Sequence, residues 1–347
     1  MDDGVAGELR ETLSRLLGAR LDAAARERAA SGELPADLWA AIAELGLPDA
    51  LVPEEAGGFG IAPADALTLL TVAGEHALPL PLADAMLAAR LLALAGLERP
   101  DGLLALAPES DLSVDGAGRV SGRVWNVPWG RHAEAVAALA ATPGGPVLVA
   151  LPRAAAAAIE TRQSIAGDPL DDLTYRDATA ATAASPVDPL TFRALGAATR
   201  VLLMAGALGA VTAMSAGYAQ ERKQFGRSIG KFQAVQQNLA ILAGEAASAS
   251  AAAGIAADAV GTGGPLLVSR IAAAKARAGE AAGIGAGIAH QVHGAIGFTQ
   301  EHRLHEFTRR LWAWRDEYGR EAEWTARLGR EMAAAGPSGL WPAMTAL

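Results

Sequence analysis

The chain of 347 residues contains no cysteine. Disulfide bonds, a thiol nucleophile and a thiolate metal site are therefore excluded, and any catalysis has to use other groups. The lack of disulfides also fits a reducing compartment such as the cytoplasm. A formal net charge of −9 argues against a nucleic-acid partner, because nucleic acids are bound by broad basic surfaces. An anionic ligand of this protein is therefore expected to be small and bound locally.

The N-terminal stretch lacks the basic, apolar and small-residue segments of a secretory signal, so we expect a cytoplasmic protein. One uncharged run, residues 201–220, is long enough to cross a bilayer. Its alanine, glycine, serine and threonine residues make it only weakly hydrophobic, and it continues directly into a charged stretch. We interpret it as a buried bundle helix and predict no membrane span.

The pattern of apolar residues changes twice along the chain. Spacings of three and four residues predict helices from about residue 10 to residue 97, interrupted by a loop at residues 46–63 that contains three prolines and four glycines. Short apolar pieces separated by glycine, proline and aspartate follow, at residues 118–127, 133–142, 145–152 and 171–178, and predict a small β domain. Long alanine-rich stretches after residue 190 predict four or five antiparallel helices.

The sequence therefore predicts a mainly α protein with a small β domain. We expect an N-terminal helical domain at residues 1–99 and a middle, β-barrel-like domain at residues 100–188. A C-terminal four-helix bundle is expected at residues 189–347. No internal repeat of fixed period is present.

A cluster of cations interrupts the longest helical region, in the stretch YAQERKQFGRSIGKFQAVQQNLA at residues 218–240. Gly226 and Gly230 allow the backbone to turn and to approach a ligand, and the planar guanidinium of Arg222 suits phosphate oxygens. The neighbouring amides and rings, which can bind and pack beside a heterocycle, are Gln224, Phe225, Phe232 and Gln233. This combination suits a dinucleotide, and the alternative is a solvated basic helix face.

Three segments resemble signatures of the acyl-CoA dehydrogenase family, and they occur in the family's order. YAQERKQFGRSIGKFQAVQ resembles the arginine signature, QVHGAIGF at residues 291–298 resembles the signature Q-x-x-G-G-x-G, and AELGLPDALVPEEAGGFG resembles the N-terminal helix-to-loop segment. The resemblance extends from about residue 34 to about residue 330. It implies the same order of helical domain, β domain and four-helix bundle.

The resemblance also implies FAD bound between subunits, usually in tetramers. Arg222, Gln224 and Phe225 would reach the diphosphate and adenosine of a neighbouring subunit's FAD, with Phe232 and Gln233 nearby. The residues that would line the same FAD from the other chain are Gln291, Val292 and Ala295, the last in place of a family glycine. The β strand that passes the flavin would contribute Trp125 and Val127, although Trp125 is equally interpretable as core.

The base that such a reaction needs is missing from its usual position. A carboxylate must remove the proton at the α carbon, and much of the family supplies it as the glutamate of Y-E-G-T. Counting from the second signature places Tyr318 there instead. The family's alternative position, early in the first bundle helix, is closed because no acidic residue lies between Asp188 and Glu221. Glu317 and Asp316 remain as the candidate bases.

Three functional hypotheses follow. In the first, the chain desaturates an acyl-CoA or acyl-carrier thioester at its α,β bond and passes electrons to an electron-transfer flavoprotein. In the second, it is the FAD-binding or structural subunit of a hetero-oligomer in which another acyl-CoA dehydrogenase-like chain carries the base. The third is a metal-binding protein, because two H-x-x-H pairs occur within sixteen residues at His290, His293, His302 and His305, although our preferred site contains no metal.

Overall fold

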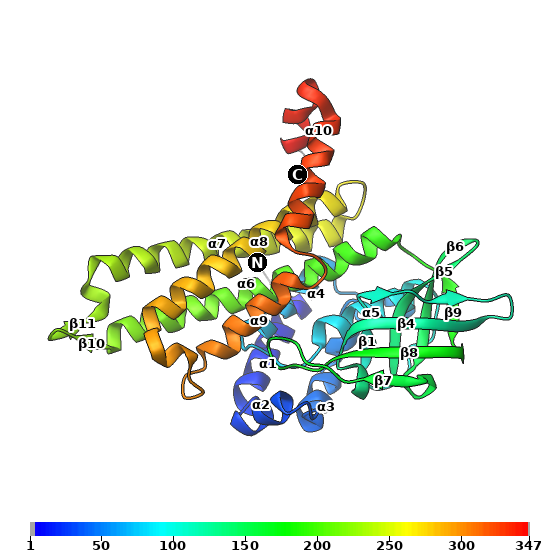
Figure 1. The fold of residues 1–347 in the computed structure, drawn as a ribbon, viewed down its shortest axis with the longest axis horizontal. Helices are drawn as coiled ribbons and strands as arrows, with labels where there is room; N and C mark the ends of the chain where they lie inside the picture. The colour runs from blue at the N-terminus through cyan, green and yellow to red at the C-terminus, as the bar shows by residue number, and fades with distance from the viewer. Residues whose placement is uncertain (1–3, 346–347) are drawn as a thin grey trace. The chain divides into compact units, whose positions relative to one another are not determined.

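The computed structural model describes residues 4–345, and the chain forms two compact units (Figure 1). Unit 1 comprises Met1–Leu69 and Pro79–Gly196, and unit 2 comprises Leu70–Leu78 and Ala197–Leu347. The three domain boundaries expected from the sequence stay predictions.

Helices precede the sheet in unit 1. They are α1 (Gly4–Arg20), α2 (Ala23–Ala30), α3 (Ala36–Glu44), the first part of α4 (Pro63–Glu75) and α5 (Leu82–Leu94). The side chain of Asp22 caps α2 by accepting a hydrogen bond from the Ala25 amide at 2.8 Å. The loop predicted at residues 46–63 is confirmed between α3 and α4, where it contains the short 3₁₀ helices η1 (Leu47–Asp49) and η2 (Glu54–Ala56).

A single sheet forms the rest of unit 1. Its strands are β1 (Leu104–Leu106), β2 (Glu109–Ser110), β3 (Ser113–Val114), β4 (Arg119–Pro128), β5 (Ala135–Thr142), β6 (Gly145–Pro152), β7 (Ala158–Glu160), β8 (Leu170–Thr179) and β9 (Ala181–Ala184). Their order is β7-β8-β4-β3-β5-β6-β9, with β1 beside β5 and β2 beside β4. The four predicted strands are confirmed as β4, β5, β6 and β8.

The sheet core follows from the alternation of side chains along each strand. On β4, Val120, Val124 and Val127 are buried, and they pack with Leu173 and Tyr175 of β8. Short 3₁₀ turns follow two strands, η3 (Gly130–His132) between β4 and β5 and η4 (Arg153–Ala155) between β6 and β7 in the sequence.

Unit 2 is a helical bundle. It contains most of α6 (Pro189–Glu221), followed by α7 (Gln233–Thr262), α8 (Leu267–His293), α9 (Leu304–Asp316) and α10 (Glu321–Thr345). Glycines allow α4 and α6 to cross closely, since a Cβ on Gly206 would lie 1.9 Å from the Thr71 carbonyl oxygen and one on Gly74 would lie 2.1 Å from that of Leu203. The predicted fold class, mainly helical with one β region, is confirmed.

Two helices, α6 and α7, are long and apolar enough to cross a membrane. In α6, 89% of the most apolar window is buried inside the protein, as the sequence interpretation of a bundle helix expects, and in α7 the share is 28%. Length and composition alone are weak evidence for a membrane span, because the core helix of a bundle passes the same test.

Candidate functional site

The arginine signature forms an exposed hairpin at the end of the bundle. Helix α6 ends at Glu221, and the strands β10 (Lys223–Gln224) and β11 (Arg227–Ser228) pair across a two-residue turn. Both turn residues, Phe225 and Gly226, have positive φ angles of 51° and 78°, which is the geometry of a type I′ turn. The short helix η5 (Ile229–Lys231) then leads into α7. The predicted interruption of the helix by its glycines is confirmed, and the cations lie on a hairpin and not on a helix face.

Aromatic rings and cations lie together on this hairpin. The Phe225 side chain is 92% exposed, and its ring meets that of Phe232 edge-on with 6.2 Å between centroids. The guanidinium of Arg227 lies 4.3 Å from the centroid of Phe232. Arg222, Gln224 and Gln233 are exposed at the same place. The chain therefore presents guanidinium, amide and aromatic groups outward.

The second signature lies at the end of α8. Gln291 and Val292 belong to the last turn of α8, and Ala295 belongs to the 3₁₀ helix η6 (Gly294–Phe298). The residue that needs a left-handed backbone here is Gly294, with φ of 63°, and Ala295 does not adopt such a φ. The alanine that replaces a family glycine is therefore accommodated without backbone strain.

The two signatures meet in the same chain. The ring of Tyr218, near the end of α6, stacks on His293 of α8 with 4.6 Å between centroids. His302 packs against both rings, at 6.1 Å from Tyr218 and 4.6 Å from His293. The resemblance assigned the two segments to opposite chains, and in this chain they lie side by side through these ring contacts.

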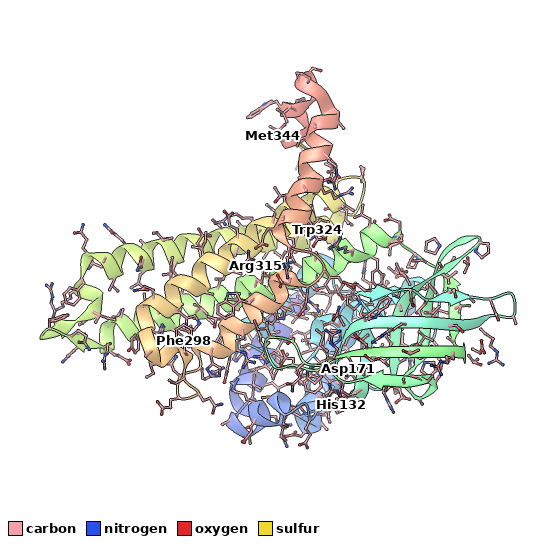
Figure 2. All side chains as sticks on the ribbon, viewed as in Figure 1. His132, Asp171, Phe298, Arg315, Trp324 and Met344 are labelled. Atoms are coloured by element: carbon pink, nitrogen blue, oxygen red, sulfur yellow. The ribbon has the colours of Figure 1, made fainter. Side chains whose placement is uncertain are left out.

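This end of the bundle fits an FAD. A Cβ added to Gly226 or to Gly294 would meet no atom within 4 Å, so the backbone at both positions is open to close approach. Phe298 adds a second exposed ring, 68% accessible, at the turn between α8 and α9 (Figure 2). Guanidinium, amide and aromatic groups match the diphosphate, the heterocycle edge and the heterocycle face of a dinucleotide.

The histidines pack against rings and backbone. His290 Nε2 lies 2.9 Å from the hydroxyl of Thr308, and its ring stacks on Phe298 at 4.0 Å. His293 Nδ1 donates to the Ala289 carbonyl at 2.8 Å. Burial lowers the pKa of His290, His293 and His302 below the usual histidine value. Within residues 4–345 no three potential ligands come together as a metal site, so the metal-binding hypothesis has no support there.

The candidate base Glu317 is held in an ion pair. It directly follows α9, and its Oε2 lies 2.6 Å from Nε of Arg200. The Arg200 side chain is 3% exposed and that of Glu317 is 24% exposed. The same guanidinium lies 4.9 Å from the ring centroid of Tyr318, which is buried and has φ of 55°. The carboxylate beside the expected base position is thus already bound to a cation.

A buried lysine fixes the same turn. Nζ of Lys275, on α8, donates to the carbonyl oxygens of Arg315 at 2.7 Å and Gly319 at 2.9 Å, and the side chain is fully buried. Burial lowers the pKa of Lys275 to about 7, partly offset by the negative charges of Glu317 and Glu321. A neutral amine still has two N–H donors for the two carbonyls.

The rest of the turn is held from both sides, where Figure 2 labels Arg315 and Trp324. The Trp324 indole donates to the Tyr318 carbonyl at 3.1 Å, and Arg315 pairs with Glu321. Asp316, the other candidate base, forms an exposed ion pair with Arg320 at 2.9 Å. We call the segment Arg315–Arg320 the base turn.

The base turn and the signature end lie apart on unit 2. Arg200 marks the base turn on α6 and Tyr218 marks the signature end, eighteen residues later. At 1.5 Å per helical residue this separation is about 27 Å. A ligand that needs both kinds of residue must span that distance or take them from two protomers, as the resemblance implies for FAD.

In unit 1, Trp125 lines a cavity of about 750 Å³. Other walls come from Glu109 and Ser110 of β2, from Leu112, and from Phe192 at the start of α6. Val127 has a fully buried side chain in the sheet core, so only its backbone remains to contact a ligand outside the core.

Comparisons with known proteins agree with this architecture. The model of the acyl-CoA dehydrogenase N-terminal domain matches residues 6–98, and that of the C-terminal domain matches residues 193–315. The chain is 30% identical to acyl-CoA dehydrogenase IpdE2 of Mycobacterium tuberculosis, over 87% of this chain and 89% of that protein. The chain therefore belongs to the acyl-CoA dehydrogenase family, whose members are oxidoreductases with FAD as cofactor.

Two solved structures share the fold. One is the ChsE4–ChsE5 complex of Mycobacterium tuberculosis, with a TM-score of 0.87 and 22% identity, over 96% of this chain and 99% of that chain. The other is a variant of the steroid ACAD Tcur3481–Tcur3483, with a TM-score of 0.86 and 24% identity, over 95% of this chain and 98% of that chain. The family and the cofactor predicted from the sequence are confirmed.

Proposed function

We propose that this chain is one subunit of an FAD-dependent acyl-CoA dehydrogenase whose catalytic carboxylate comes from another acyl-CoA dehydrogenase-like chain. The assembly desaturates an acyl-CoA thioester at its α,β bond and passes electrons to an electron-transfer flavoprotein. One observation carries the proposal: Tyr318 stands where the base is expected, and the neighbouring Glu317 is bound to Arg200 at 2.6 Å.

The side chains at the base turn are unsuited to removing a proton at neutral pH. A tyrosine hydroxyl, with a usual pKa of about 10, is a weak base there. Glu317 would have to leave a largely buried guanidinium, and separating a buried ion pair costs several kcal/mol, about 3 to 5 by analogy with partner deletions. The base turn of this chain is thus built for stability.

The other residues have roles in binding. When bound, FAD supplies the hydride acceptor of the family's chemistry. Arg222 and the amides of Gln224 and Gln233 suit its diphosphate and adenosine, and Trp125 faces the cavity in unit 1. The names of two fold neighbours, ChsE4–ChsE5 and Tcur3481–Tcur3483, describe complexes of two different chains, which supports a mixed assembly here as well.

A second candidate keeps the base in this chain. Glu317 is adjacent to the family position and its side chain is 24% exposed, so a substrate that displaces Arg200 could release the carboxylate. In that case this chain alone would desaturate its substrate.

The two candidates differ in a direct measurement. We expect the chain purified alone, loaded with FAD, to show no acyl-CoA-dependent bleaching of the flavin absorbance, and the chain co-purified with its partner to bleach. In the assembly, Glu317→Gln should change the bleaching rate by less than about twofold, whereas loss of a general base lowers rates about 10²- to 10⁴-fold. Asp316→Asn is the matched control. Bleaching by the isolated chain, abolished by Glu317→Gln, would reverse the assignment.

A further inference from the structure

The strand that carries Trp125 departs from regular pairing at that residue. The pairing of β4 with β8 shifts between Val124 and Val127. Within this bulge Asn126 has φ of 55°, a left-handed conformation that costs free energy in any residue with a side chain. Contacts outside the ladder must therefore hold the bulge and the indole beside it.

A buried carboxylate on β8 supplies these contacts. Asp172 accepts a hydrogen bond from the Asn126 amide at 2.9 Å through Oδ1. Its Oδ2 lies 3.1 Å from Nη2 of Arg123 and 3.0 Å from Nη1 of Arg162. The Arg123 guanidinium carbon lies 6.0 Å from the ring centroid of Trp125. Asp172 thus binds the backbone that follows Trp125 and shares with Glu160, at 2.7 Å, the cation over its ring.

We propose that Asp172 is a positioning residue that sets the orientation of Trp125, and thereby the shape of the cavity wall that receives the flavin. The inference rests on the proposed function in one respect, the placement of the flavin beside Trp125. The bonds of Asp172 are charge-assisted and shielded from water, so they resist changes of the bulge more than an exposed ion pair would.

The neighbouring residue provides a matched control. Asp171 is equally buried on β8 (Figure 2), but it accepts from the backbone amide and guanidinium of Arg131 and from the Arg162 amide at 3.3 Å. Both of these partners lie outside the bulge. Replacing Asp171 therefore removes a buried charge from the same strand without releasing the bulge.

The test compares four variants of the chain, co-purified with its partner: Asp172→Asn, Arg123→Gln, Asp171→Asn and Trp125→Leu. FAD affinity is measured by titration, and the environment of bound flavin by its visible circular dichroism. We expect Asp172→Asn to weaken FAD binding about tenfold, as for one charge-assisted contact, and to change the dichroism band. Arg123→Gln should shift the band in the same direction. Asp171→Asn should leave affinity within about twofold.

The outcomes separate this inference from the proposed function. Equal effects of Asp172→Asn and Asp171→Asn on flavin would overturn the positioning role. Should Asp172→Asn fail to fold, Arg123→Gln decides, because the Arg123 side chain is 31% exposed and its loss spares the core; an unchanged band then overturns the role. If Trp125→Leu binds FAD as tightly as the native chain, the flavin is not beside Trp125, and the proposed placement fails with the inference.

Discussion

The two units of the molecule bury charges of opposite sign. In unit 1 the buried groups include the carboxylates of Asp171 and Asp172, and the arginines that pair with these two are partly exposed. In unit 2 the buried groups include the basic side chains of Lys275 and Arg200, and Glu317, which pairs with Arg200, is partly exposed. Each unit therefore has an inner charge and an outer partner, with the signs reversed.

The sign of the buried charge follows from the backbone amides and carbonyls that have no hydrogen-bond partner within the sheet or the helix. The bulge and turn after β4 leave amide N–H groups, at Asn126 and Arg131, and carboxylates accept from them. The end of α9 leaves carbonyl oxygens, and Lys275 donates to those of Arg315 and Gly319. In this chain, carboxylates therefore meet the unpaired amides after β4, and an amine meets the unpaired carbonyls after α9.

The largest expected effect tests the outer partner in unit 2. Glu317→Gln leaves the guanidinium of Arg200 buried without its counter-charge, and we expect a loss of about 3 kcal/mol in the free energy of unfolding. Asp316→Asn, which removes an exposed ion pair, should cost less than about 0.5 kcal/mol. Denaturant unfolding of both variants measures the difference, and equal losses would contradict the importance of burial.

The second-largest expected effect is the loss of the buried Lys275 side chain in unit 2. Lys275→Met leaves two buried carbonyl oxygens without donors, partly offset by relief from burying an amine, so we expect a loss of about 2 kcal/mol. Lys231→Met, at an exposed position, should have little effect. Thermal unfolding of the two variants provides the measurement. A Lys275→Met variant as stable as the native chain would show that the two hydrogen bonds from Lys275 to the base turn contribute nothing to the free energy of unfolding.

The corresponding inner charge of unit 1 should matter somewhat less. Asp171→Asn keeps one oxygen acceptor, and Arg131 can turn toward solvent, so we expect a loss of about 1.5 kcal/mol. The exposed Glu160, which pairs with Arg123, is the control, and Glu160→Gln should cost less than about 0.5 kcal/mol. If Asp171→Asn lowers the free energy of unfolding by more than Glu317→Gln does, the charged contacts of unit 1 stabilise the chain more than those of unit 2.

The last prediction is a pH dependence of stability that arises from Lys275 in unit 2. Lys275 has a folded pKa of about 7 and a usual value of 10.5, so between these values the unfolded chain binds more protons. Stability attributable to Lys275 therefore rises with pH across this window, by at most about 1.4 kcal/mol per unit. The native chain should gain stability relative to Lys275→Met between about pH 7.5 and 9.5. Parallel pH curves would contradict the lowered pKa.

Local patterns in the sequence were sufficient for much of the fold. A short apolar piece set off by glycine and proline predicted β4, and the two glycines of the arginine signature predicted the break between α6 and α7. The cofactor segments could be found because their residues are close in the sequence, and the missing glutamate could be found by counting. These features depend on spacing along one segment.

The charged contacts could not be predicted, because their partners are distant in sequence. Arg200 and Glu317 are 117 residues apart, and Asp172 lies 46 residues from Asn126. Lys275 stands in the alanine-rich stretch IAAAKARAGEAAG, where its neighbours suggest one more solvated cation. The one available signal was Arg200 itself, which directly precedes the uncharged run of α6.

The almost fully accessible phenylalanine at the tip of the hairpin bears on how the protein is made. A newly synthesised copy without cofactor displays Phe225 beside several cations, and transiently exposed apolar surface favours aggregation. If the proposed partner chain covers that tip, the isolated polypeptide is the more aggregation-prone form. Heterologous production should then give more soluble material when both genes are expressed together.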